Sequence, residues 1–154
     1  MHISDGVLST QVIAAGGILT GAGAAIGLRK MNLDKIVHVA FASSVFFLAS
    51  LINVRIPPSS VHLSLLGPMG LLLGWSSFPG LFVALLLQAL LFQFGGLLSL
   101  GVNTFNHAAA AMISWFIFSG LIRRSTPLLS AVFSFSAGAF AVLLSSALVA
   151  LSLY

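Results

Sequence analysis

Long apolar runs separated by short polar stretches make up almost the whole of this chain. A helix needs about 20 apolar residues to cross the hydrocarbon core of a bilayer. The pattern therefore predicts an all-α fold, a polytopic transmembrane helical bundle with about six membrane segments, in a single integral membrane domain of residues 1–154. The expected segments are residues 7–28, 36–52, 61–75, 78–94, 104–122 and 128–153.

The third run, residues 61–75, differs from the other five. It is short for a full crossing and contains Pro68, which removes a backbone donor from any helix around it. Two arrangements stay open: either the run spans the membrane, or it is broken and re-enters on the side from which it came.

Composition supports an integral membrane protein. Hydrophobic residues make up 59% of the 154 residues and charged residues only 5%, and the mean hydropathy is +1.17. Soluble domains carry about 25% charged residues. The net charge of +4 comes from six Lys and Arg, which are too few for a nucleic-acid surface. We expect a multi-pass protein of the inner (plasma) membrane without a nucleic-acid partner.

The basic residues predict the orientation of the chain. They gather at residues 29–35 and 123–124, and such stretches are typically cytoplasmic. The charges follow the first span instead of preceding it, which places the N-terminus on the outer side. If residues 61–75 cross the membrane, both basic stretches fall on the cytoplasmic side, together with His38.

The same topology brings three polar regions together at the outer ends of the helices. A membrane histidine taken alone is more often a hydrogen-bonded packing residue than a ligand, so a site prediction depends on this convergence. The regions are the N-terminus, the loop of residues 55–61 with His62, and the loop of residues 95–102 that leads to Asn103, Asn106 and His107.

Met1 and His2 form a potential metal chelator. A free terminal amine, the amide nitrogen of residue 2 and the His2 imidazole can close adjacent chelate rings that lie roughly in one plane. A planar nitrogen field suits Ni(II) and Cu(II), whereas Zn(II) prefers a tetrahedron. The chain has no cysteine, so one of three further histidines is available to fill the remaining corner.

Glycines predict close contacts between helices. Gly17 with Gly21, and Gly23 with Gly27, form two small-xxx-small patterns in the first span. Packing inside this chain and contact with a partner helix are equally consistent with these patterns. We interpret the glycine pair at residues 95–96 as a place where backbones pack closely.

An enzymatic function is not expected. The chain has only two carboxylates, Asp5 and Asp34, and the predicted topology places them on opposite sides of the membrane. It has no cysteine nucleophile, no Ser-His-Asp grouping with a shared side and no ATP-binding loop. The energy for any transport must then come from another subunit.

Three separated motifs carry a family resemblance. They are MHISDGVLS at residues 1–9, SVHL followed by LGP at residues 60–68, and GG followed by LGVNTFN at residues 95–106. In this order they resemble the cobalt/nickel substrate-binding subunits (CbiM/NikM type, S components) of energy-coupling-factor transporters, over nearly the whole chain. The resemblance implies that the N-terminal nitrogens of Met1, His2 and His62 bind the metal. It also implies partners: a transmembrane coupling subunit, cytosolic ATPase subunits and a small accessory membrane subunit.

The chain departs from that family pattern at several places. Phe94 stands where many relatives have a histidine, and His107 stands where methionine is usual. Relatives also continue through another span beyond Tyr154, so the chain is either a short member or lacks a further C-terminal span. The opening with aspartate at residue 5 is closer to nickel members than to cobalt members.

These observations predict a membrane substrate-capture subunit for uptake of a divalent transition-metal ion. We expect Ni2+ first and Co2+ next, as the transported ligand, and no resident cofactor. Met1, His2 and His62 would hold the ion, and three neighbours would orient or seal the site. Those neighbours are Asn103, Asn106 and His107. The alternative is a small structural or pore-forming membrane protein in which the Met-His terminus is incidental.

Overall fold

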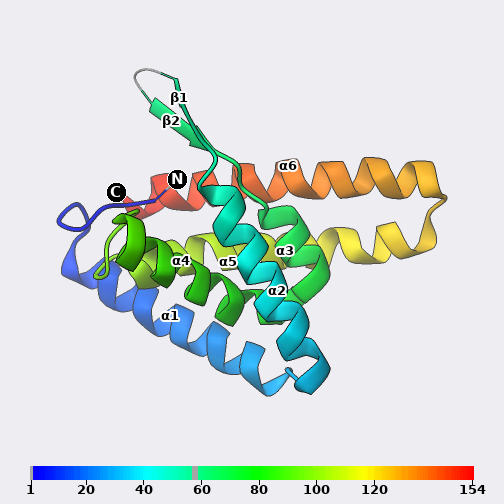
Figure 1. Cartoon of the computed structure of the whole chain (residues 1–154), viewed down its shortest axis with the longest axis horizontal. Helices are drawn as coiled ribbons and strands as arrows, with labels where there is room; N and C mark the ends of the chain where they lie inside the picture. Colours follow the sequence, from blue (N-terminus) through cyan, green and yellow to red (C-terminus); the bar gives the residue numbers. More distant parts are fainter. Residues whose placement is uncertain (1, 57–58) are drawn as a thin grey trace.

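Packed helices build the molecule (Figure 1). The computed structural model describes residues 2–56 and 59–154, with the backbone alone described in the strands between residues 53 and 62. Within these described residues, five helical segments are long and apolar enough to cross a membrane, against about six predicted. They are α1 (Thr10–Arg29), α2 (Leu33–Ser50), the unit Leu66–Phe92, α5 (Leu100–Arg124) and α6 (Pro127–Ser152).

Local sequence signals set where the helices begin. The hydroxyl of Ser9 caps α1 and accepts a hydrogen bond from the backbone N–H of Val12 at 3.4 Å. Asn32 caps α2 in the same way, accepting from the N–H of Lys35 at 2.9 Å. Pro127 begins α6, where its missing N–H costs no helical hydrogen bond. The long helices therefore begin within about one turn of the predicted runs.

The predicted third segment, residues 61–75, is not a full span. Its helix, α3 (Leu66–Leu73), has eight residues and is about 12 Å long. The helix ends at Gly74, whose φ of 53° favours glycine. A short 3-10 turn, η1 (Gly74–Ser76), then leads into α4 (Ser77–Phe92). Five candidate spans therefore stand against about six predicted segments, because this run forms only a half-length helix that is counted in one unit with α4.

Glycines seat α3 against the middle of the bundle. A Cβ added to Gly67 would overlap the backbone of Gly138, halfway along α6, and one added to Gly70 would overlap the backbone of Ala111 in α5. Only glycine allows two helices to approach so closely. The short helix is therefore placed by its neighbours rather than by its own length.

A two-stranded antiparallel hairpin interrupts the helices and was not part of the all-α expectation. Strand β1 (Asn53–Ile56) pairs with β2 (Ser59–His62). The N–H of Leu63 donates to the carbonyl of Ile52 at 3.2 Å and closes the base of the hairpin. Valine and isoleucine in this stretch favour extended backbone. The predicted outer loop of residues 55–61 is thus replaced by paired backbone wherever it is described.

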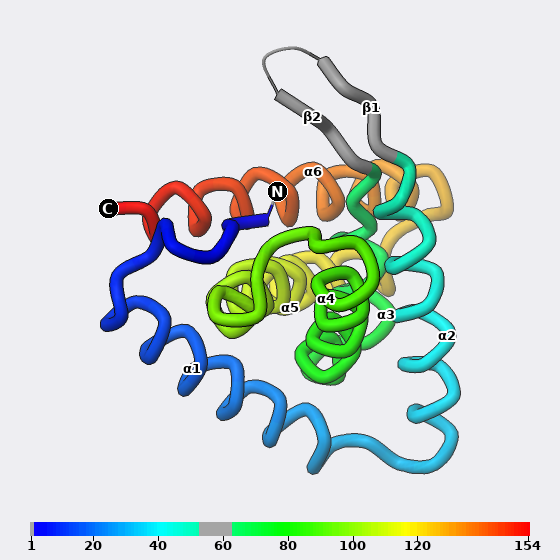
Figure 2. Tube along the Cα trace, turned by 60° about the vertical axis from the view of Figure 1, so that its left-hand side comes forward, coloured from blue at the N-terminus to red at the C-terminus, as the bar shows by residue number. Residues whose placement is uncertain are grey.

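Helix α5 is the centre of the bundle, and α1, α3, α4 and α6 all pack against it (Figure 2). Four consecutive alanines at residues 108–111 are buried and let the neighbouring helices approach. The hydroxyl of Ser114 donates to the carbonyl of Ala137 at 2.9 Å and joins α5 to α6. The amide of Gln88 donates to the hydroxyl of Ser50 at 2.7 Å and joins α4 to α2.

The glycines of α1 divide between two faces. Gly23 and Gly27 face inward, where an added Cβ would overlap the ring of Phe78 or atoms around Pro79. An added Cβ at Gly17 or Gly21 meets no described atom within 4 Å. The second small-residue pattern therefore serves packing inside this chain. In the first, the Cβ positions point outward, but the backbone of Gly17 packs against Gly101 of α5.

The helices separate two ends of the molecule. Lys30 and Lys35 line one cleft together with Arg123, so both basic stretches lie at the same end, where the end of α3 and η1 also lie. We call it the basic end. At the opposite end, which we call the N-terminal end, residues 2–6 meet the start of α5 and the last turns of α6 (Figure 1).

Candidate metal centre

The N-terminal segment, residues 2–6, lies across the N-terminal end beside α6 (Figure 2). Its anchor is Ile3, whose side chain is 5% exposed and packs with Val102 of α5 and Val149 of α6. Burial of an isoleucine side chain stabilises a folded state by about 1.5–3 kcal/mol. This contact holds a segment that has no helix or strand of its own.

Asn103 binds both peptide groups of Ile3. Its Oδ1 accepts a hydrogen bond from the Ile3 N–H at 2.9 Å, and its Nδ2 donates to the Ile3 carbonyl at 2.9 Å. The hydroxyl of Ser99 donates to the same carbonyl at 2.7 Å. A peptide N–H only donates and a carbonyl only accepts, so this pairing fixes the orientation of the Asn103 amide. The position of the N-terminal segment is thus set by the first turn of α5.

Asp5 fixes the segment at a second point. Its carboxylate accepts hydrogen bonds from the backbone N–H of Ser99 at 2.9 Å and of Leu98 at 3.4 Å. The bond from Ser99 is the main reason that the pKa of the Asp5 carboxyl lies below its usual 3.8. A Cβ at Gly96 would overlap this carboxylate. The predicted close packing at residues 95–96 is therefore confirmed, and the N-terminal segment is what packs there.

His2 lies against His107. The two rings stack with centroids 5.6 Å apart and planes 26° from parallel. His107 is buried in α5, and its Nδ1 lies 2.9 Å from the carbonyl oxygen of Asn103. Because that carbonyl only accepts, Nδ1 carries the proton of the neutral ring and Nε2 carries the lone pair. Gly95 has a φ of 77°, and a Cβ there would lie 3.3 Å from the Cβ of His2.

The structure brings three of the six predicted site residues together: His2, Asn103 and His107. Asn106 is directed elsewhere, because its Nδ2 donates to the hydroxyl of Ser152 at 3.0 Å and joins α5 to α6. His38 lines the cleft at the basic end, away from the other candidates, in agreement with its predicted side.

Two of the three predicted ligands fall outside this description. Met1 is not among the described residues, and neither is the side chain of His62, whose backbone pairs with Asn53 at the end of β2. Among the described side chains, those of residues 2–52 and 63–154, no group of three His, Cys, Asp or Glu that could hold a metal ion is found.

Sequence reasoning did not single out Ile3, Asp5 and Ser99, which hold the N-terminal segment in place. One signal was present, because Asp5 is one of only two carboxylates in the chain and lies four residues from the N-terminus. Phe94, which stands where many relatives were expected to have a histidine, is half-buried and stacks on Phe92, with ring centroids 5.8 Å apart.

A family model and several relatives match this chain. The CbiM model, described as the cobalt uptake substrate-specific transmembrane region, matches residues 2–154. A relative from Haemophilus influenzae, named as a metal transport protein, is 44% identical over 118 residues, which are 77% of this chain and 57% of the relative. The fused nickel transport protein NikMN of Rhodobacter capsulatus is 33% identical over 114 residues, 70% of this chain and 33% of that protein.

The cobalt transport protein CbiM of Geobacter sulfurreducens is 31% identical over 151 residues, which are 92% of this chain and 43% of the relative. The chain thus spans between 33% and 57% of the length of these three relatives. A crystal structure described as that of a transition metal transporter superposes with a TM-score of 0.68 at 30% identity. The match covers 94% of this chain and 68% of that one.

These comparisons agree with the residues. The chain crosses the membrane several times, and the first and third of the motifs that carried the resemblance meet at the N-terminal end. A substrate-specific transport component is not a catalytic subunit, so the expectation that the chain is not an enzyme is confirmed. This chain belongs to the CbiM family, the cobalt uptake substrate-specific transmembrane region.

Proposed function

We propose that this chain captures a divalent transition-metal ion at its N-terminal end for uptake, with Ni2+ preferred and Co2+ next. The observation that carries the proposal is the docking of the N-terminal segment by Asn103, which holds the residue directly after the proposed chelate. Relatives named for nickel and for cobalt transport support both candidate ions.

The proposed ligands are the amine and the amide nitrogen at the N-terminus, the His2 imidazole and the His62 imidazole. The first three share adjacent chelate rings, which favour the planar field that Ni(II) accepts. The amine and the amide must lose protons to bind, so the affinity should fall as the pH decreases. The ion is the transported substrate and leaves the site in each cycle.

The three residues predicted to lie around the ligands would act on the ligands and not on the ion. Asn103 sets the position of the N-terminal segment, and His107 packs against the His2 ring and fixes its plane. Asn106 would act at one remove, because it holds α5 against the last turn of α6. Groups that orient ligands in this way typically change metal affinity by about 10–100-fold when they are replaced.

Uptake would require partners, because the sequence has no ATP-binding loop. We propose a transmembrane coupling subunit, cytosolic ATPase subunits and a small accessory membrane subunit, as the family implies. Co-purification of the coupling subunit and the ATPases with this chain tests the proposal. A chain that conducts ions or assembles alone would instead support the pore-forming or structural alternative.

A blocked N-terminus gives the most direct test of the ligand set. One added residue before Met1 converts the amine into an amide and should abolish nickel binding measured by calorimetry. The same residue added after Tyr154 is the matched control and should leave the binding unchanged. Nickel binding by the N-terminally extended chain with native affinity would refute the proposed ligand set.

Histidine substitutions rank the remaining donors. His2→Ala and His62→Ala should each remove most of the nickel affinity, and His107→Ala should weaken it by about 10–100-fold. His38→Ala is the control, because His38 lies at the basic end. Equal losses at His38 and His62 would contradict the proposed site.

A further inference from the structure

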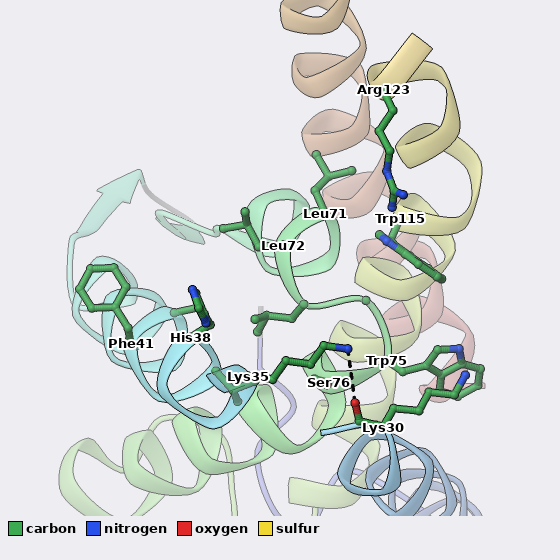
Figure 3. A pocket seen from close by; sticks show the side chains of 14 residues that line it. Lys30, Lys35, His38, Phe41, Leu71, Leu72, Trp75, Ser76, Trp115 and Arg123 are labelled. Atoms are coloured by element: carbon green, nitrogen blue, oxygen red, sulfur yellow. Dashed lines mark hydrogen bonds between the residues drawn. The ribbon is translucent and has the colours of Figure 1, made fainter. Parts of the chain in front are cut away.

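A cleft at the basic end has no part in the proposed metal centre. It encloses about 680 Å³ between α2, α3, η1 and α5 (Figure 3), within the range of about 300–1,000 Å³ that ligand pockets occupy. Lys30, which follows the last residue of α1, lines it on one side. Because it lies at the opposite end from His2 and Asn103, what it binds is a separate question from metal capture.

The cleft is strongly cationic. Lys30, Lys35 and Arg123 line it, which is half of the six Lys and Arg in the chain. The Nζ of Lys30 lies 5.0 Å from the centroid of the Trp75 ring, and the Nζ of Lys35 donates to the backbone carbonyl of Lys30 at 3.4 Å. None of the lining residues, all of which belong to the described part of the chain, is acidic. The cleft therefore presents positive charge to a ligand.

The cleft also has an apolar, aromatic wall. Both tryptophans of the chain, Trp75 and Trp115, line it, and tryptophan is typical of the boundary between hydrocarbon and headgroups. Phe41 of α2 and Leu72 of α3 line it with 72% and 77% of their surfaces exposed. Figure 3 shows Arg123 extending along α5 toward Trp115. Positive charge and exposed hydrocarbon thus meet at one level of the bundle.

We propose that this cleft binds an anionic phospholipid. Its phosphate would lie among Lys30, Lys35 and Arg123, and an acyl chain would lie along Phe41 and Leu72. A soluble anion would use the cations but leave the apolar wall exposed, and a neutral lipid would cover the wall but leave the cations without a counter-charge. Only an amphipathic anion satisfies both, and anionic lipids bind to basic pockets between membrane helices through this combination.

Tryptophan fluorescence reports on the cleft, because Trp75 and Trp115 line it and the chain has no other tryptophan. The full chain is reconstituted in phosphatidylcholine vesicles that contain brominated lipid, which quenches tryptophan fluorescence on contact. Brominated phosphatidylglycerol should quench more strongly than brominated phosphatidylcholine at equal mole fraction. The ratio of the affinities for phosphatidylglycerol and phosphatidylcholine follows from the two quenching curves. Lys35→Gln should lower this ratio about fivefold. The double variant Lys35→Gln with Arg123→Gln should bring the two affinities close to each other.

Arg124→Gln is the matched control, since Arg124 is next to Arg123 and does not line the cleft. It should keep the native preference, and nickel binding by all variants should report an intact fold. Equal quenching of the native chain by both lipids would overturn the proposal. So would displacement of the quenching lipid by free inorganic phosphate. A third refuting result is an unchanged lipid preference in Lys35→Gln together with loss of a coupling subunit, which would identify the cleft as a protein interface.

Discussion

Replacing Asn103 releases the N-terminal segment without touching a proposed ligand. Asn103→Leu keeps a side chain of similar length and removes both amide groups that bind Ile3 at 2.9 Å. The hydroxyl of Ser99 still reaches the Ile3 carbonyl at 2.7 Å, so the carbonyl keeps one partner. The Ile3 N–H loses its hydrogen bond to Oδ1 in a buried position.

The expected size of the effect follows from those two hydrogen bonds. Each contributes a net of about 0.5–1.5 kcal/mol, so together they stabilise the docked segment by about 1–3 kcal/mol. That free energy is a factor of about 5–150 in the ratio of docked to undocked segment. If nickel binds only to the docked segment, its apparent affinity falls by at most this factor.

Nickel calorimetry on the chain with its native N-terminus measures this loss, and hydrogen exchange at the Ile3 amide reports docking independently. Asn106→Leu is the matched control, because it removes the hydrogen bond to Ser152 and leaves the contacts of Ile3 in place. It should weaken nickel binding less than Asn103→Leu does, because it affects the ligands only through the contact between α5 and α6. Native affinity in Asn103→Leu despite fast exchange at Ile3 would refute the reasoning. Equal losses in both variants would assign the effect to general weakening of α5.

Three further perturbations test the same architecture. Gly96→Ala should speed exchange in the N-terminal segment and weaken nickel binding, because its Cβ collides with the Asp5 carboxylate; Gly120→Ala, which has open space, should change neither. The Asp5 carboxylate has a pKa below 3.8, so its contribution to docking is present above that pH and is lost as the pH falls below about 4. Asp5→Asn should remove this acid step from the exchange profile. Gly23→Leu should lower the Tm of the chain by colliding with an aromatic ring of α4, whereas Gly21→Leu should keep the native Tm. Native Tm in Gly23→Leu would contradict the inward placement of that face.

The long helices could be predicted because their signals are local. Apolar length and polar punctuation set α1, α2, α5 and α6 to within about a turn. Pro68 and the short length of residues 61–75 left two arrangements open, and the sequence did not decide between them. The position of α3 depends on distant neighbours, because Gly67 packs on Gly138 and Gly70 packs on Ala111. A single sequence does not show which backbones will touch. The hairpin was missed for a related reason, since pairing between short strands is fixed by the helices that hold their ends.

The candidate site could be predicted as a meeting of regions but not as a set of contacts. The topology argument brought His2 toward Asn103 and His107, and the structure places them together. It did not separate Asn106, which is three residues beyond Asn103 and therefore about 60° around the helix, enough to face α6. The contact that holds Asp5 in place could not be predicted either, because Ser99, which donates the hydrogen bond, lies 94 residues away in the sequence.

The contacts of Ile3 set the order in which the molecule can be completed. Its hydrogen-bond partner Asn103 lies 100 residues later in the chain, and its apolar partner Val149 lies near the end of α6. At a synthesis rate of about 5–20 residues per second, the first residues wait for at least about 5–20 s before Asn103 exists. Ile3 can therefore find its partners only after residues 103 and 149 have been made. Docking of the N-terminal segment is therefore a late event that depends on α5 and α6 being made and packed together.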